Sequence, residues 1–297
     1  MFKKSSSTSP IRIFVAATPS EWLPAKILEF SILRNTKAQV SVKFLYQFHK
    51  TIPVPAAPEN RQRTPFSFQR FLIPELCNFS GKAIYLDSDM LVFRDIQALW
   101  NHDFSNCSLQ SVKSSGQNRP PQFGVMLLNC SNLNWQINQI INQLDMGALH
   151  YSDLMFEMKI VDKVGRDIDA NWNSLESYSA EETALLHYTD METQPWTYYG
   201  KNPLAHIWLN YLKNALNEGF ITERELRREI KKGHVRPSLL PQILNPLSED
   251  MALKHCDENF VAPHKFPGGQ VPTKKNFFTQ LKINLIRLLP PYSIYQK

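Results

Sequence analysis

Residues 82–89 read KAIYLDSD, a short apolar run that ends on two carboxylates one residue apart. A run of this length bounded by polar residues is typical of a buried β-strand. Because α/β folds bind ligands beyond the carboxyl ends of their strands, Asp87 and Asp89 could hold a hard divalent cation against a diphosphate. The same pattern also fits a polar strand end that leads into a helix through Asp95, and both interpretations stay open here.

Strands and helices are expected to alternate on both sides of this stretch. Apolar runs indicate the strands, and apolar residues at helical spacing indicate the helices. The expected strands cover 11–17, 39–48, 123–128 and 184–188, and the expected helices cover 23–33, 66–76 and 133–147. This alternation predicts an α/β sheet covered by helices on both faces.

The sequence after Trp196 is helical in character. One helix is expected to begin at Asn202 and a second at Thr222, where Glu225 completes a capping-box pattern and Gly233 marks the end. The expected domains are a catalytic domain over 1–199, a helical attachment over 200–250 and a basic, Pro-rich tail over 251–297.

The composition is that of a folded protein with anionic partners. Hydrophobic residues make up 43% and charged residues 20% of the 297 residues, close to the globular average. The net charge of +6 fits nucleotide phosphates, nucleic acid or an acidic lipid surface. No apolar run reaches the roughly 18 residues needed to cross a bilayer, and the widely spaced cysteines suggest neither a zinc site nor a disulfide framework. We therefore expect a cytoplasmic protein, soluble or associated with the inner face of a membrane.

Three blocks of the sequence resemble the signature of glycosyltransferase family 8, which includes glycogenin and bacterial lipooligosaccharide galactosyltransferases. The first runs from Arg70 to Trp100 and carries RFL, AIYLDSDMLV and a Leu-Trp pair at the family's spacing. The second, QFGVMLLN at 122–129, is similar to the family strand FNAGVLLIN. The third, HYTDMETQPW at 187–196, looks like the family segment H(Y/F)xGxxKPW. With the opening strand, the resemblance covers residues 11–196.

The resemblance implies a GT-A type α/β fold, with a mixed central sheet, flanking helices and a small helical C-terminal region. It implies a retaining, metal-dependent transfer of a hexose, first of all glucose or galactose, from a UDP-sugar. The metal would be Mn(II) or Mg(II). The acceptor, whether a sugar, a lipid-linked glycan or a protein, is not identified by these residues, and they leave open whether retention uses a covalent intermediate or same-face attack.

A set of site residues also follows from the resemblance. The positions that hold the metal in the family match Asp87, Asp89 and His187, and those that contact uridine match Ala16, Ala17 and Thr18. The position of Arg70 would support the phosphate or the donor sugar. Ser88, Asn173 and Gln194 would complete the donor and acceptor sides of the site. Without the resemblance, a histidine on an apolar strand is more often a core or surface residue than a ligand.

The sequence departs from the family at several of these positions. Gln122 replaces the asparagine that touches the donor sugar, and Gln194 replaces the lysine that pairs with phosphate. The family's acidic pair near the reacting sugar face corresponds only loosely to Asp153. We therefore expect Asp153 or Gln122 to stabilise the oxocarbenium-like centre, with helix capping or surface solvation as the alternative role of Asp153. Trp172 is expected to belong to the core.

Two enzyme or binding functions compete with sugar transfer. A metal-dependent nucleotidyltransferase would also use paired carboxylates, but residues 16–21 lack the Gly-rich phosphate loop of such enzymes. A transferase-like nucleotide-sugar-binding protein without turnover would explain the two glutamine replacements, although the intact metal ligands argue against it. No nucleic acid is expected as a partner, because the sequence has no recognisable readout module.

The end of the chain carries charge of one sign. Residues 259–297 contain several lysines and one arginine but no Asp or Glu, and apolar residues recur at helical spacing over 275–289. A helix there would set a wide apolar face beside basic residues. Such a helix predicts that residues 272–297 contact an anionic membrane peripherally. The pattern predicts equally well that the helix docks on the catalytic domain.

Overall fold

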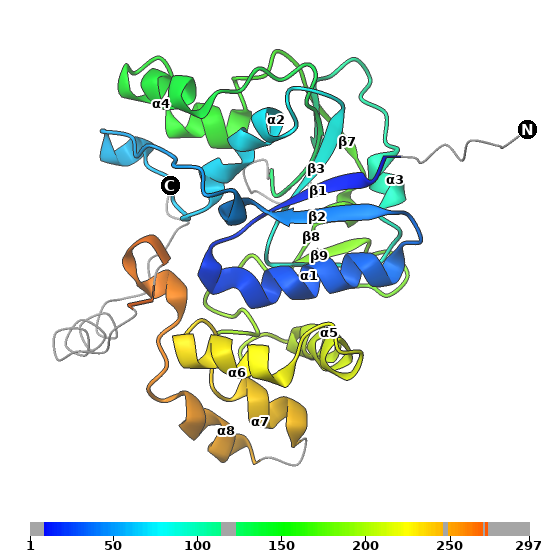
Figure 1. The fold of residues 1–297 in the computed structure, drawn as a ribbon, viewed down its shortest axis with the longest axis vertical. Coiled ribbons are helices and arrows are strands. Elements are labelled where there is room, and N and C mark those ends of the chain that lie inside the picture. Colours follow the sequence, from blue (N-terminus) through cyan, green and yellow to red (C-terminus); the bar gives the residue numbers. More distant parts are fainter. Residues whose placement is uncertain (1–8, 114–122, 246–248, 270, 273–297) are drawn as a thin grey trace, which may run out of the picture. The chain divides into compact units, whose positions relative to one another are not determined.

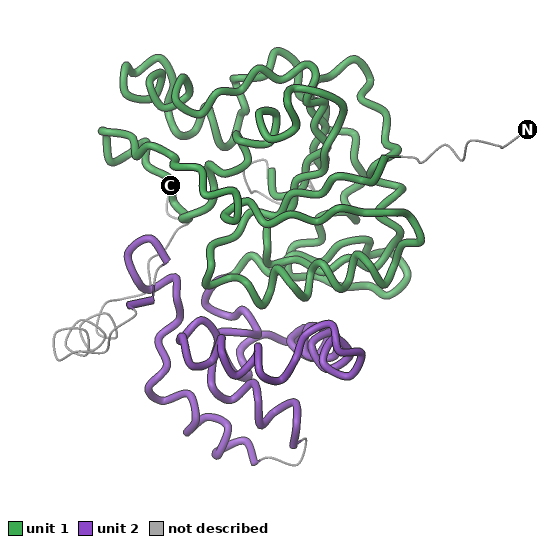
Figure 2. The backbone as a smooth tube through the Cα atoms, in the orientation of Figure 1, with its two compact units in different colours: residues 1–190 green, residues 191–297 purple. Residues whose placement is uncertain are grey.

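The computed structural model describes residues 9–113, 123–245, 249–269 and 271–272. The chain forms two compact units, residues 1–190 and residues 191–297 (Figure 2), and each is described by itself. None of the helices in these described ranges is long and apolar enough to span a bilayer. The amphipathic helix predicted over 275–289 lies outside the described residues.

A six-stranded mixed sheet forms the centre of the first unit (Figure 1). Its strands are β1 (Ile11–Ala16), β2 (Val40–Phe44), β3 (Lys82–Asp87), β5 (Leu109–Val112), β6 (Val125–Asn129) and β7 (Val164–Ile168). The spatial order is β2-β1-β3-β6-β5-β7, in which β1 is parallel to both neighbours and β6 is antiparallel to both neighbours. This confirms the mixed α/β sheet expected from the sequence.

Both faces of the central sheet are buried, because successive side chains of a strand point to opposite faces. Phe14 and Tyr85 belong to one apolar cluster, and Ile13 and Ile84 belong to the other. Helix α1 (Trp22–Asn35) contributes its apolar side to the second cluster, and α4 (Ile137–Asp145) contributes to the first. The two helices lie on opposite sides of the strands in Figure 1. The continuous apolar runs of β1 and β3 follow from burial on both faces.

A second, three-stranded sheet begins directly after the Asp87 to Asp89 turn. It contains β4 (Met90–Val92), β8 (Ser174–Leu175) and β9 (Leu185–His187) in the order β4-β9-β8. Strand β4 is antiparallel to β9, with Met90 opposite His187. The small sheet therefore carries a residue from far along the chain back to the end of β3.

Some expected elements have a different form. The helix predicted over 66–76 is a 3-10 helix, Ser67–Leu72, followed by the short α2, Ile73–Leu76. Pro74 has no N–H group, so it could not donate the backbone hydrogen bond that an α-helix continuing from residue 67 would need at this position. The strand predicted over 39–48 stops at Phe44 and continues as a 3-10 helix, Leu45–Phe48.

The second unit is helical. It contains α5 (Ala205–Asn217), α6 (Glu223–Lys232), α7 (Leu239–Leu244) and α8 (Asp250–Asp257). The capping box that opens α6 is confirmed: the backbone N–H of Glu225 donates to Thr222 Oγ1 at 3.2 Å, and that of Thr222 donates to Glu225 Oε2 at 2.8 Å. The helix ends at Gly233, which adopts a φ of 75°.

Candidate functional site

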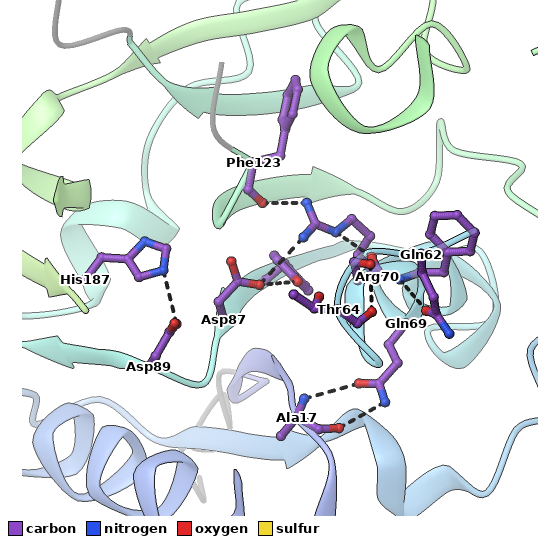
Figure 3. Close-up of polar contacts among 12 residues, drawn as sticks. Ala17, Gln62, Thr64, Gln69, Arg70, Asp87, Asp89, Phe123 and His187 are labelled. Carbon is purple, nitrogen blue, oxygen red and sulfur yellow. Dashed lines mark hydrogen bonds and ion pairs between the residues drawn. The ribbon is translucent and has the colours of Figure 1, made fainter. Parts of the chain in front are cut away.

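Three potential metal ligands meet at the carboxyl end of β3. Asp87 is its last residue, and Asp89 lies in the turn before β4. Met90 pairs with His187 in the β4–β9 ladder, and the backbone N–H of Tyr188 donates to the carbonyl of Asp89 at 2.9 Å, which continues the pairing by one residue past His187. One ligand atom from each of Asp87, Asp89 and His187 lies within 4.8 Å of the others. Figure 3 shows these side chains close together, with Asp87 from the end of β3, Asp89 from the following turn and His187 from β9.

Hydrogen bonds orient the ring of His187, which is 4% exposed. Its Nδ1 lies 2.8 Å from Asn173 Oδ1, and its Nε2 lies 3.0 Å from Asp89 Oδ1. Because the amide oxygen only accepts, Nδ1 carries a proton, and Nε2 is left to bind either a second proton or a cation. Burial alone would lower the pKa of His187, but the carboxylates of Asp89, Asp87 and Glu176 together outweigh it and the pKa is raised.

Asp87 has a neutral and a cationic neighbour. The hydroxyl of Tyr85 donates to Asp87 Oδ1, and Arg70 Nη2 lies 3.6 Å from the same oxygen. Burial raises the pKa of Asp87; Arg70 opposes this and Asp89 adds to it, and the net pKa is raised. Two carboxylates at one largely buried point therefore favour the arrival of positive charge, whether a proton or a metal ion.

Arg70 is held entirely by this unit. Its Nε donates to the carbonyl of Ser67 at 2.9 Å and its Nη1 to that of Phe123 at 3.0 Å. The guanidinium carbon lies 4.6 Å from the ring centroid of Tyr85. Arg70 is thus held in place beside Asp87. The resemblance gave Arg70 a role in donor binding, but the sequence did not indicate this contact with Asp87.

Gly124 leaves the space in which the ligands meet. A Cβ atom built on it would lie 2.8 Å from Asp87 Oδ2 and 2.9 Å from His187 Cε1. Its carbonyl accepts from the N–H of Asp87 at 3.1 Å, so the backbone cannot simply withdraw. Two carboxylates and an imidazole nitrogen whose ligand atoms lie within 4.8 Å of one another fit Mn(II) or Mg(II). In the sequence this glycine lies within the block at 122–129, where nothing local indicates its part in the site.

The end of β1 lies beside the end of β3, because Ala16 pairs with Asp87 in register. Gln69 fixes the next residue: Gln69 Nε2 donates to the carbonyl of Ala17 at 2.9 Å, and the N–H of Ala17 donates to Gln69 Oε1 at 3.2 Å. Both backbone groups of Ala17 are therefore occupied within the protein (Figure 3). The sequence contains no signal for this contact, which joins residues 52 positions apart.

Glu21 is a further acidic group near the site. Its Oε2 accepts a hydrogen bond from the N–H of Thr18 at 2.6 Å. Thr18 is the last of the three residues expected to contact uridine. Burial raises the pKa of Glu21 to about 8, with smaller contributions in the same direction from Asp89 and Asp87. Glu21 therefore lies within electrostatic reach of the carboxylates, although the sequence analysis did not include it.

Asp153 has two partners in a different part of the first unit. It begins a π-helical turn, Asp153–Glu157, where Asp153 Oδ2 accepts from the N–H of His150 at 2.9 Å. Its Oδ1 lies 2.6 Å from Lys159 Nζ, and the hydrogen bond from Lys159 lowers the pKa of Asp153. These contacts match the capping role that the sequence leaves open, and a catalytic role for Asp153 stays a prediction.

The remaining expected residues are distributed as follows. Ser88 is buried in the turn between the two aspartates, and Trp172 is buried in the apolar cluster on the α1 side, as expected for a core residue. Gln194 belongs to the second unit, where its carbonyl accepts from the N–H of Thr197 at 3.0 Å. Gln122 lies outside the described residues.

Comparison with known proteins finds a family model that matches part of this chain. Residues 25–151 match the model of glycosyl transferase family 8. Protein CDI of Arabidopsis thaliana is 26% identical over 241 residues, which is 72% of this chain and 90% of that protein.

Solved structures share the fold. The apo-form glycosyltransferase GlyE of Streptococcus pneumoniae superposes with a TM-score of 0.52 at 17% identity, over 72% of this chain and 63% of GlyE. The galactosyltransferase LgtC, in complex with donor and acceptor sugar analogs, superposes with a TM-score of 0.51 at 14% identity, over 74% of this chain and 100% of LgtC. These likenesses establish the GT-A fold, while the chain spans under two thirds of GlyE.

Proposed function

Because residues 25–151 match the model of glycosyl transferase family 8, we propose that this chain is a transferase of that family, which moves a hexose, glucose or galactose, from a UDP-sugar onto a sugar, lipid-linked glycan or protein acceptor. We propose further that the reaction needs Mn(II) or Mg(II) and retains the configuration at the anomeric carbon. The observation that carries the proposal is the meeting of Asp87, Asp89 and His187 within 4.8 Å at the end of β3.

Asp87, Asp89 and His187 are the residues that would hold the ion. When bound, the ion would supply positive charge against the diphosphate that leaves with uridine. Asn173 keeps the proton on Nδ1 of His187 and so leaves Nε2 for the ion. Arg70 and Tyr85 keep Asp87 Oδ1 turned toward themselves, and Gly124 keeps Oδ2 unobstructed.

The end of β1 would receive the nucleoside. Since Gln69 occupies the backbone of Ala17 and Glu21 occupies the N–H of Thr18, these residues offer a fixed edge rather than free backbone donors. A rigid edge positions a base with little loss of conformational freedom on binding. Arg70, Ser88 and Asn173 complete the proposed donor site within the first unit, and a donor-binding role for Gln194, which belongs to the second unit, stays a prediction.

The face of the sugar opposite the leaving group has two proposed residues, Asp153 and Gln122. Asp153 is already paired with Lys159, so a part in the reaction would need that ion pair to open. Asp153→Asn therefore distinguishes its two roles: loss of turnover with intact UDP binding supports a catalytic role, and unchanged turnover supports the cap.

The decisive experiment measures UDP release and sugar transfer. The full chain would be incubated with UDP-glucose or UDP-galactose and Mn(II), with and without chelator. Asp87→Asn, Asp89→Asn and His187→Ala should each abolish metal-dependent UDP binding and turnover, because the ligand set is incomplete. Asp103→Asn, which alters an exposed carboxylate of the same unit, is the matched control. Metal-dependent UDP binding that survives in all three variants would remove the basis of the assignment.

A further inference from the structure

A shallow cleft of about 380 Å³ lies at the end of the central sheet opposite to the metal ligands. Its lining comes from the residues just before β3, β5 and β7 and just after β6, and Lys82 at the start of β3 pairs with Asn129 at the end of β6. A strand of the length of β3 spans roughly 17–20 Å. The cleft is therefore separate from the proposed donor site.

An exposed aromatic ring stands at this cleft in an unusual backbone conformation. Phe79 is 41% exposed and has a φ of 50°, next to Asn78 with a φ of 52°. The helix end explains Asn78: its N–H donates to the carbonyl of Glu75 and that of Phe79 to the carbonyl of Pro74, both at 2.8 Å, as in a Schellman motif.

This motif does not explain the second left-handed residue. The residue at the position of Phe79 usually packs its apolar side chain back against the helix. A bulky residue with positive φ is a backbone outlier, and such strain gathers at functional sites. Phe79, the strained residue, is also the aromatic residue in the wall of the cleft.

The polar part of the cleft wall is available to a ligand. Among the residues that the structure describes, the side chains of Ser108, Asn132, Asn134 and Asp162 form no hydrogen bond or ion pair with one another or with the rest. Amide and hydroxyl groups both donate and accept, so they match a molecule rich in hydroxyl groups. The apolar floor is provided by Leu133, Ile160 and Val161.

The charge of the lining excludes the proposed donor. No lysine or arginine is present among these nine lining residues, and Asp162 is the one acidic residue. A phosphate or carboxylate would meet a like charge here and no compensating cation. A neutral polyol has no such cost, and the apolar C–H face of a sugar ring can pack on an aromatic ring.

We propose that this cleft is a binding subsite for a neutral oligosaccharide. Its use, to anchor a long acceptor away from the reacting end, rests on the proposed transferase function, whereas binding itself does not. The subsite holds one sugar ring against Phe79, while the amides of Asn132 and Asn134 hydrogen bond to its hydroxyl groups.

The test is calorimetric titration of the full chain with maltoheptaose, cellotetraose and xylotetraose, without UDP or metal. At least one should bind saturably in the millimolar range, and trigalacturonate should not bind, because of Asp162. Phe79→Asn keeps a residue that tolerates positive φ and removes the ring, so it should weaken binding about tenfold without loss of stability. Asn134→Ala should weaken binding as well. Met146→Asn, at another exposed apolar side chain of this unit, should leave it unchanged.

The proposal is overturned if none of the neutral probes binds, if trigalacturonate binds as tightly, or if Phe79→Asn binds like the wild type. A titration with UDP and Mn(II) on the same sample separates the two proposals. Oligosaccharide binding without metal-dependent UDP binding supports the subsite and contradicts the transferase mechanism. Metal-dependent UDP binding with no oligosaccharide binding supports the transferase mechanism and contradicts the subsite.

Discussion

Replacement of Gly124 by alanine adds a single methyl group at the point where the proposed metal ligands meet. The new Cβ would lie 2.8 Å from Asp87 Oδ2 and 2.9 Å from His187 Cε1, whereas ordinary van der Waals contact begins at 3.4 Å. Asp87 Oδ2 must therefore move by about 0.6 Å and His187 by about 0.5 Å, if the backbone stays in register. Both movements exceed the tolerance of about 0.2 Å in metal–ligand distances.

The expected result is a loss of metal affinity that is large compared with the loss of stability. Misplaced ligands should weaken Mn(II) binding by about 10- to 100-fold, as disturbed supporting contacts do at other metal sites. Extra volume in a packed interior should lower the free energy of unfolding by about 1–3 kcal/mol. Calorimetry with Mn(II) in the presence of UDP measures the first quantity, and urea unfolding without metal measures the second.

Gly147→Ala is the control, because Gly147 has a φ of 71° and no atom within 4 Å of an added Cβ. It should lower stability through backbone strain and leave metal affinity unchanged. If Gly124→Ala bound Mn(II) as tightly as the wild type, the three side chains would not form the proposed metal site.

Three further substitutions probe the surroundings of the ligands. Asn173→Ala should weaken Mn(II) binding about tenfold, because Nδ1 of His187 loses its acceptor, and Asn173→Asp should restore it; calorimetry compares the two. Arg70→Lys should lower turnover and reduce the free energy of unfolding by about 1–3 kcal/mol, since an ammonium cannot reach both Asp87 and the carbonyl of Phe123; kinetics and urea unfolding measure these. Glu21→Gln should stabilise the protein at pH 8 and above but not near pH 4. The reason is that folding raises the pKa of the Glu21 carboxyl from 4.5 to about 8. The stability that this carboxyl contributes below pH 4.5 is therefore lost as the pH rises toward 8, at up to about 1.4 kcal/mol per pH unit. A pH-independent difference in unfolding free energy would contradict that cause.

Most of the strands that the sequence predicts bury apolar residues, although β2, which it also predicts, is largely half-buried. β1, β3 and β6 are apolar on both faces over residues 13–16, 83–86 and 125–128, so a continuous hydrophobic run marks each of them. β5 carries the buried polar residues Gln110 and Ser111, and therefore has no such run. Gln110 Nε2 donates to the carbonyl of Phe104 at 3.0 Å, and Ser111 Oγ donates to that of Gly165 at 3.1 Å. These partners exist only after folding, so local composition could not reveal the strand.

The metal ligands were predictable for a different reason than their supports. The spacing of Asp87 and Asp89 and the HY…PW block carry the family resemblance in the sequence itself. Asn173 acts through one hydrogen bond to His187 and Gln69 through two hydrogen bonds to Ala17. The resemblance named Asn173 for the sugar sides of the site, but neither of these contacts could be recognised before folding, because many polar residues would look equally suitable. The supporting contacts depend on tertiary placement, which a local motif does not encode.

The placement of the ligands couples the two sheets of the first unit. Asp87 belongs to the central sheet and His187 to the small sheet, and the turn through Asp89 is the direct covalent link between β3 and β4. The pair Met90 and His187 fixes the register at this link, because a shift by one residue would turn His187 to the opposite face. A cation held by all three ligands would therefore join elements that are otherwise connected by a short turn and three-residue strands. Since such an ion binds the folded unit and not the unfolded chain, saturating metal should stabilise the first unit by mass action. The small sheet is thus explained as the part of the fold that delivers the third ligand, which the carboxylate turn alone cannot supply.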